Sequence, residues 1–259
     1  MRKPIIAGNW KMYKTIAQAI ELANGLKREF FDLNPDDMDI VICPVYTVLS
    51  EVSEVIADSN IRLGAQDLYW QDEGAFTGEI SAPMLKDAGA SYVIIGHSER
   101  RQFFGETNEA VNRKLKAALQ HGLTPIVCVG EMLAEREANK TMEVLKDHVT
   151  GGLAGLSAED AGKIVIAYEP VWAIGTGKTA TAAQAQEAQK YIRDLLGTLY
   201  NKDIANSIRI QYGGSVKPEN IEEIMQQPDV DGALVGGASL KVDSFSGIIK
   251  RGLKVKVKK

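Results

Sequence analysis

Short runs of apolar, often β-branched residues alternate along the chain with longer stretches in which apolar residues recur at helical spacing. The short runs predict strands near residues 5–9, 38–43, 61–66, 92–95, 124–129, 164–167, 208–212 and 232–235. Because these runs are almost continuously apolar, we expect both faces of the sheet to be covered, as is typical of parallel sheets.

The longer stretches predict helices over 15–30, 108–121, 132–151, 181–200 and 220–227, with a short helical turn after Ser157. Residues that favour helix N-caps, such as Thr107 and Ser157, stand at two of these starts. Strands alternating with helices over 259 residues, without a Pro/Ser-rich linker, indicate the α/β class. We therefore expect a single (β/α)8 barrel domain of eight parallel strands over residues 1–259; a doubly wound open sheet is the alternative.

The composition is that of an average globular protein, with 45% hydrophobic and 25% charged residues. A formal net charge of −4 argues against a protein held by its overall charge to nucleic acid or to an anionic membrane. The N-terminal residues lead directly into a strand, and apolar runs are too short for a signal peptide or a membrane span. We expect a cytoplasmic protein with neither partner.

Cysteine and histidine are sparse. Cys43 and Cys128 both lie in apolar strand-like runs, which predicts buried thiols. The spacing of Cys, His and Asp does not resemble a metal site, so we expect no metal. The basic, alternating tail at about 254–259 is expected to be a solvated end, with a weak edge strand as the alternative.

Polar residues and glycines gather where five of the predicted strands end. In a parallel barrel the carboxyl ends of all strands open on one face, so these five groups should converge there. They are Asn9 with Lys11, the segment 96–101 around His97, Glu169, the turn 213–215 with Ser215, and the turn 236–239.

Two of these groups suggest binding of a small anion. The Gly-rich turns after the seventh and eighth strands let backbone N–H groups approach a ligand closely, and loops at this position bind phosphate in (β/α)8 barrels. Ordinary tight turns are the alternative for either pair of glycines.

Glu169 stands at a strand end, before a segment that begins with Pro170 and contains Gly175 and Gly177. This arrangement predicts a catalytic base beneath a lid with stiff ends and defined hinges. A surface glutamate in an ordinary connection is the alternative. The same segment resembles parts of a P-loop and of a dinucleotide motif, but the spacing fits neither, so no nicotinamide cofactor is expected.

His97 follows a strand where a helix or turn begins. A helix N-terminus disfavours the imidazolium, which predicts a neutral ring acting as a donor. Asn9 and Lys11 are alternate residues leaving a strand and should point the same way, and Lys11 could supply a cation for a phosphorylated or enolate-like species. A structural histidine and a solvated lysine are the alternatives.

Five stretches together resemble the triosephosphate isomerase family, in family order and over nearly the whole chain: 8–12, 94–101, 167–177, 212–216 and 234–240. The resemblance implies the (β/α)8 fold and an aldose–ketose isomerase of glycolysis and gluconeogenesis. Its reaction would interconvert dihydroxyacetone phosphate and D-glyceraldehyde 3-phosphate through an enediolate.

The resemblance also implies the catalytic roles. Glu169 would be the base, neutral His97 would polarise the substrate oxygens, and Lys11 would stabilise the developing negative charge. Asn9 would orient the oxygens, and Glu99 would be a supporting charge. Residues of the family's substrate site would be Asn9 and Lys11 together with the phosphate-binding Gly175, Ser215, Gly236 and Gly237, under a lid over 170–179. No cofactor is implied.

The family further suggests a homodimer through the loop 71–78, with Thr77 reaching toward the partner's site. Two alternatives stay open: another phosphate-binding barrel enzyme, such as an aldolase or a different sugar-phosphate isomerase, and a non-catalytic protein of the same fold. A Schiff-base aldolase needs an interior lysine at a strand, and Lys11 is the one obvious candidate.

Overall fold

The computed structural model describes residues 2–174 and 180–256, and within them eight parallel strands close into a barrel. Each strand pairs with its neighbours in the sequence, and the seam joins the last strand to the first, with Ile5 opposite Gly232. The closed order excludes the open sheet. The strands are β1 Ile5–Asn9, β2 Asp39–Cys43, β3 Ile61–Ala65, β4 Tyr92–Ile95, β5 Thr124–Val129, β6 Val165–Tyr168, β7 Arg209–Tyr212 and β8 Gly232–Val235.

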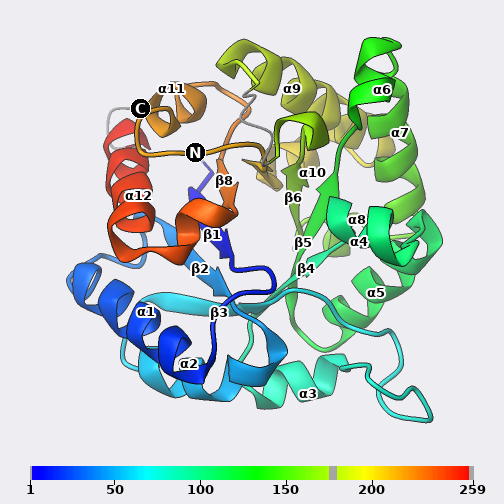
Figure 1. Ribbon diagram of the computed structural model, residues 1–259. Coiled ribbons are helices and arrows are strands. Elements are labelled where there is room, and N and C mark those ends of the chain that lie inside the picture. Colours follow the sequence, from blue (N-terminus) through cyan, green and yellow to red (C-terminus); the bar gives the residue numbers. More distant parts are fainter. Residues whose placement is uncertain (1, 175–179, 257–259) are drawn as a thin grey trace.

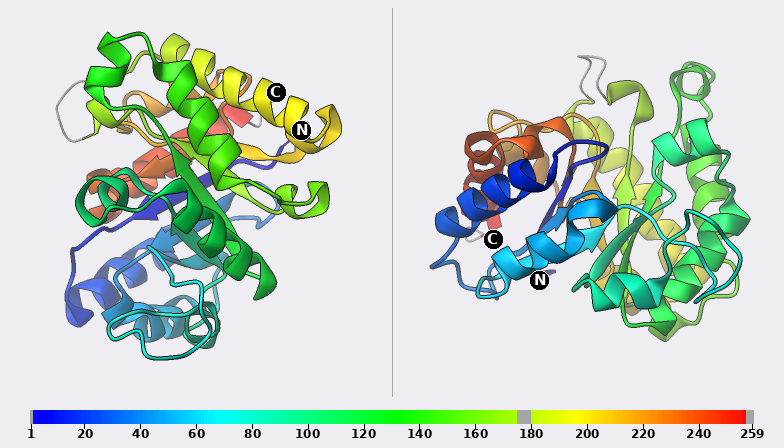
Figure 2. Two further views of the ribbon diagram at one scale, coloured as in Figure 1. Left: turned by 90° about the vertical axis from the view of Figure 1, so that its right-hand side faces the viewer. Right: turned by 60° about the horizontal axis from the view of Figure 1, so that its bottom comes forward.

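Helices surround the barrel (Figure 1). Figure 2 shows that the last helix, α12, returns to lie beside α1, so the end of the chain packs near its beginning. No helix of the described part is long and apolar enough to cross a membrane. The helices are α1 Ile16–Glu29, α2 Leu49–Ile56, α3 Ala82–Asp87, α4 Ser98–Phe104, α5 Asn108–Gln120, α6 Leu133–Glu137, α7 Thr141–Gly152, α8 Ala158–Ala161, α9 Ala182–Leu199, α10 Lys202–Ser207, α11 Ile221–Met225 and α12 Val242–Lys256, with 3-10 turns η1 Tyr46–Val48, η2 Val171–Ala173 and η3 Gly237–Leu240.

The alternation of side chains along each strand divides the core in two. Ile5 and Ala7 of β1 point into the barrel, whereas Ile6 between them packs outward beneath the helices. Both cysteines belong to the interior cluster as free, buried thiols, as predicted. The interior is therefore filled with side chains, and a ligand can bind only at an end of the barrel.

Two predictions, one for a helix and one for the basic tail, differ from the structure. The helix expected over 132–151 is two helices, because Asn139 adopts a left-handed backbone conformation (φ 57°) that ends α6. The basic tail was expected to be a solvated end, with an edge strand as the alternative; over 254–256 it is neither, because α12 continues to Lys256 and Val255 is buried. Residues 257–259 lie outside the described part of the chain.

Candidate active site

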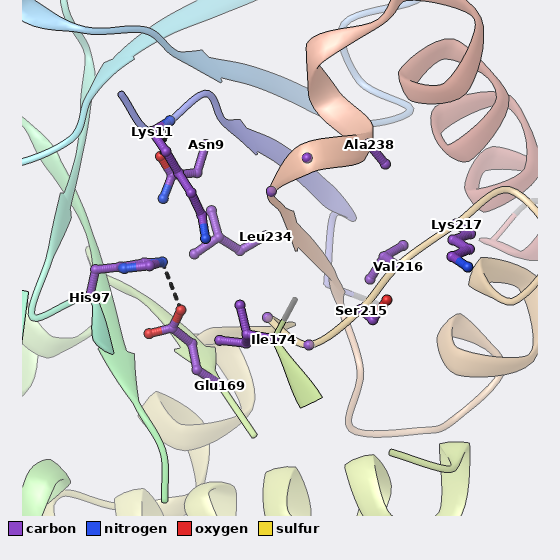
Figure 3. Close-up of a pocket in the computed structure, with 14 residues that line it drawn as sticks. Asn9, Lys11, His97, Glu169, Ile174, Ser215, Val216, Lys217, Leu234 and Ala238 are labelled. Carbon is purple, nitrogen blue, oxygen red and sulfur yellow. Dashed lines mark hydrogen bonds and ion pairs between the residues drawn. The ribbon is translucent and has the colours of Figure 1, made fainter. Parts of the chain in front are cut away.

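The carboxyl ends of the strands surround a cavity of about 270 Å³, and most of the predicted site residues meet there (Figure 3). β1 contributes Asn9, and the turn after it contributes Lys11; the segments that directly follow β4 and β6 contribute His97 and Glu169. The loops after β7 and β8 form the opposite side. The described lining consists of Asn9, Lys11, His97, Glu169, Ile174, Gly213, Gly214, Ser215, Val216, Lys217, Leu234, Gly236, Gly237 and Ala238.

Glu169 is 2% exposed, and both of its carboxylate oxygens are engaged. Oε1 lies 2.9 Å from Nε2 of His97, and Oε2 accepts a hydrogen bond of 3.0 Å from the backbone N–H of Ser98. Burial acts to raise the pKa of Glu169, but His97, the Ser98 N–H and Lys11 outweigh burial and hold the pKa below its ordinary value. The carboxylate is therefore ionised at neutral pH and able to accept a proton.

His97 is the N-cap residue of α4. Its Nδ1 accepts a hydrogen bond of 3.3 Å from the backbone N–H of Glu99, which requires the neutral ring with its proton on Nε2. Burial acts to lower the pKa of His97, yet the carboxylates of Glu169 and Glu99 outweigh burial and raise it. The hydrogen bonds are those of the predicted neutral donor. From the sequence alone the helix N-terminus is expected to lower the pKa of His97, whereas the pKa is raised because the Glu169 carboxylate faces the same ring.

Lys11 holds a left-handed backbone conformation (φ 52°), which costs a non-glycine residue about 1–2 kcal/mol. Two side chains fix this turn: Oδ1 of Asn9 accepts from the Lys11 N–H at 3.0 Å, and Nε2 of Gln66 donates to the Lys11 carbonyl at 2.8 Å. The turn directs the ammonium into the cavity (Figure 3). Lys11 Nζ lies 2.5 Å from Oε1 of Glu99, so the cation is paired.

The far side of the cavity is suited to an anion. Gly213, Gly214 and Ser215 follow β7, and Gly236 and Gly237 follow β8, where they begin the 3-10 turn η3. Backbone N–H groups and the Ser215 hydroxyl can donate there without obstruction by side chains. Figure 3 shows Ser215 across the cavity from His97 and Glu169. Among the described lining residues Glu169 is the one carboxylate.

Two of the predicted site residues are not among the described residues that line this cavity. Glu99 does not line this cavity; it holds Lys11 from an adjoining cavity of about 360 Å³, which Asn9, Lys11 and His97 also border. Gly175 lies outside the described residues, as does the rest of the predicted lid beyond Ile174. The described part of that segment, from Pro170, carries the turn η2.

Sequence reasoning missed two polar residues that support the site. Gln66 directly follows β3 and fixes the turn at Lys11, as described above. Glu131 follows β5 by two residues and is fully buried. The same criterion that found the other groups, a polar residue at a strand end, would have found both.

Glu131 joins the beginning of the predicted lid to the barrel. One oxygen, Oε1, accepts hydrogen bonds from Tyr168 Oη at 3.1 Å, Trp172 Nε1 at 2.9 Å and Arg136 Nη1 at 3.1 Å. The Arg136 guanidinium also stacks over the Trp172 ring, 4.8 Å from its centre. A buried carboxylate with three donors therefore fixes the first residues of this segment.

Comparison with known proteins gives one consistent result. The family model described as triosephosphate isomerase matches residues 4–252. A protein of that name from Geobacter metallireducens is 62% identical over 251 residues, covering 96% of this chain and 98% of its own length. Another from Geotalea uraniireducens is 57% identical, with coverage of 96% and 99%. The crystal structure of triosephosphate isomerase from Bartonella henselae superposes with a TM-score of 0.86 at 41% identity, covering 96% and 98% of the two chains.

Proposed function

The chain belongs to the triosephosphate isomerase family, and from that premise we propose that it interconverts dihydroxyacetone phosphate and D-glyceraldehyde 3-phosphate with Glu169 as the base. The observation that carries this proposal is the position of a buried carboxylate against a histidine donor, across a cavity from a glycine-rich wall suited to an anion. The reaction is a step of glycolysis and, in the reverse direction, of gluconeogenesis.

In the proposed mechanism Glu169 removes a proton from the carbon beside the carbonyl and returns it to the neighbouring carbon. Substrate oxygens take the place of Glu169 at Nε2 of His97, which donates to them as a neutral imidazole. When substrate displaces the Glu169 carboxylate from Nε2, the larger of the two carboxylate contributions that raise the pKa of His97 is removed and that of Glu99 remains, which favours the neutral ring when substrate is bound. Asn9 orients the oxygens.

The charge that develops on the enediolate is stabilised by Lys11, which Glu99 holds in place. The phosphate group occupies the opposite side of the cavity, at Ser215, Gly236 and Gly237, with Gly175 assigned to the same role by family resemblance. The segment 170–179 closes over the intermediate and limits loss of its phosphate group. The chemistry as proposed needs no cofactor or metal.

A Schiff-base aldolase is the less favoured alternative. It requires an uncharged lysine amine as nucleophile, whereas the Lys11 ammonium is ion-paired with Glu99 and Lys217 is exposed on the rim. Borohydride treatment in the presence of dihydroxyacetone phosphate should therefore leave the activity intact. Irreversible inactivation with one substrate fragment bound per chain would favour the aldolase.

The decisive experiment measures turnover of D-glyceraldehyde 3-phosphate by the wild type, Glu169→Gln and Glu159→Gln. Glutamine keeps the size of residue 169 but cannot accept the proton, so we expect kcat to fall by at least about 1000-fold. Glu159 is an exposed glutamate of α8, and its variant should match the wild type. Undiminished turnover by Glu169→Gln would remove Glu169 from the mechanism, and a folded wild type without turnover would contradict the proposed reaction.

A homodimer through the loop 71–78 is also part of the proposal. Large apolar side chains are exposed around the loops that follow β1, β2, β3 and β4: Met12, Tyr13, Ile16, Tyr46, Phe76, Met84 and Phe104. Such a patch is typical of a protein interface. The loop projects from the body before α3 (Figure 1), and the cavity of about 360 Å³ between Met12, Tyr46 and Phe104 could receive the partner's Thr77. We propose that the dimer is cytoplasmic, because glycolysis takes place in the cytoplasm.

A further inference from the structure

The backbone that carries Glu169 lies along a three-residue segment of the neighbouring strand end, residues 129–131. The carbonyl of Val129 accepts a hydrogen bond of 2.8 Å from the Glu169 N–H, and the carbonyl of Glu131 accepts one of 3.1 Å from the Val171 N–H. Pro170 between them has no N–H to donate. The position of the base therefore depends on how firmly residues 129–131 are held.

Gly130 is the middle residue of this segment and packs directly on Glu169. A Cβ at position 130 would lie 1.7 Å from the carbonyl oxygen of Glu169, so a side chain is sterically excluded. Position 130 can therefore be anchored only through its backbone. Its N–H donates to Nδ1 of His148 at 3.3 Å. His148 belongs to α7, which packs on the outside of β5 (Figure 1).

The hydrogen bond from the Gly130 N–H determines the protonation state of the His148 ring. Because a backbone N–H can only donate, Nδ1 must be unprotonated, and the proton of the neutral ring lies on Nε2. Burial, the larger cause, and the nearby Arg101 guanidinium of α4 lower the pKa of His148 to about 4, while Asp147 of α7 and Glu169 at the end of β6 act in the opposite direction. His148 is thus a neutral acceptor throughout the neutral pH range.

The surroundings of His148 connect it to both sides of the base. A cavity of about 150 Å³ beside the ring is bordered by Ser98, whose N–H binds the Glu169 carboxylate, and by Val171, whose N–H binds Glu131. Arg101 and Glu135 are the charged residues on its lining. Arg101 donates to the Gly96 carbonyl at 2.9 Å, so it holds the end of β4 as His148 holds the end of β5.

We propose that His148 is a positioning residue for the isomerase reaction: its Nδ1 fixes the Gly130 peptide, and the Gly130 peptide fixes the backbone of Glu169. The inference rests on the proposed role of Glu169 as the base. A base that moves by a fraction of an ångström loses alignment with the proton it transfers, although the phosphate group remains bound on the far side of the cavity. The role predicts an effect on kcat with little effect on substrate binding.

The test uses two variants of the full-length protein with side chains of equal size. His148→Asn retains an acceptor oxygen in the place of Nδ1, whereas His148→Leu has none. We expect the asparagine variant to keep kcat within about twofold of the wild type, and the leucine variant to lose roughly tenfold in kcat with KM nearly unchanged. Inhibition by inorganic phosphate should be the same in both, while a planar enediolate mimic should bind the leucine variant about tenfold more weakly.

Controls separate the outcomes. Gln102→Ala alters the lining of the same cavity but leaves the hydrogen bond between Gly130 and His148 in place, so it should match the wild type. A folded leucine variant with unchanged kcat, or equal losses in the leucine and asparagine variants, would overturn the inference. If the leucine variant does not fold, a tenfold loss in the folded asparagine variant still overturns it. Retained turnover by Glu169→Gln would instead refute the proposed base, independently of both His148 variants.

Discussion

At the scale of single residues, His148 links the site to the pH dependence of stability. Its pKa is about 4 in the folded chain and about 6.5 when unfolded, so between these values the unfolded chain binds the additional proton. The contribution of neutral His148 to the free energy of unfolding is complete above about pH 6.5, the pKa of the unfolded chain, and is lost as the pH falls toward 4.

Between pH 7 and pH 5 we expect the wild type to lose about 2 kcal/mol of unfolding free energy that His148→Asn retains. Urea unfolding of both proteins at the two pH values measures this difference. Parallel losses in the two proteins would show that His148 does not titrate in this way.

The residues that touch the cavity were largely predictable from sequence, because each is a chemically distinctive side chain at a strand end. Lys11, His97 and Glu169 meet in the structure as this rule predicts. The hydrogen bond between Gly130 and His148 was not predictable, since it joins a glycine to a helical residue and neither carries a local pattern. The left-handed conformation of Lys11 depends on Gln66, 55 positions away, and could not be read from residues 9–12.

At the scale of secondary-structure elements, the seam between β1 and β8 is a junction so closely packed that a single added methyl group would disturb it. A Cβ at position 232 would lie 1.8 Å from the carbonyl oxygen of Ile5, which is backbone and cannot move aside. Gly232→Ala must therefore separate the two strands that close the barrel.

We expect Gly232→Ala to lower the unfolding free energy by more than about 2 kcal/mol, because it strains the backbone and also breaks hydrogen bonds between β1 and β8. Gly197→Ala in α9 is the matched control, because its Cβ would meet only the Cβ of Ala205 in α10, at 3.8 Å. That change should stabilise the chain by about 0.5–1 kcal/mol through helix propensity. Thermal unfolding of the two variants should thus shift in opposite directions; equal shifts would contradict the account of the seam.

Element prediction succeeded where apolar pattern and length agreed. The eight strands were located within about a residue at each end, because their continuous apolar runs are bounded by polar residues. Short helices such as α2 and α3 were missed, since 8 and 6 residues give too few turns for a periodic signal. The break between α6 and α7 depends on the conformation of Asn139, which hydrophobic periodicity does not encode.

At the scale of the whole molecule, the projecting loop is held in place before any partner binds. His121, the C-cap residue of α5, lies 2.8 Å from Asp72 in the loop, and the Arg113 guanidinium of α5 lies 5.4 Å from the centre of the ring of Trp70, which directly precedes the loop. These contacts hold the loop and the residue before it against α5 and its C-terminal end. A loop fixed in this way loses less conformational entropy on association.

For the dimer we expect Thr77→Asp to yield monomers, because a carboxylate at the loop tip would be buried without a partner. Phe31→Asp is the matched control: Phe31 is 66% exposed at the end of α1, away from the loops that follow β1 to β4. Sedimentation velocity should show monomers for the first variant and dimers for the second. Dimers for Thr77→Asp would refute this loop as the interface.

The two interior thiols can report the rate at which the barrel opens. Cys43 in β2 and Cys128 in β5 are fully buried, and burial raises the pKa of both, so neither reacts while the strands stay closed. A thiol reagent in excess should label them at the rate at which the barrel opens, which reports kinetic stability without denaturant. Labelling of both at one rate would mean that the barrel opens as a unit. Two different rates would show that one side of the barrel opens before the other. The cysteine that reacts sooner would identify that side as the one containing β2 or the one containing β5.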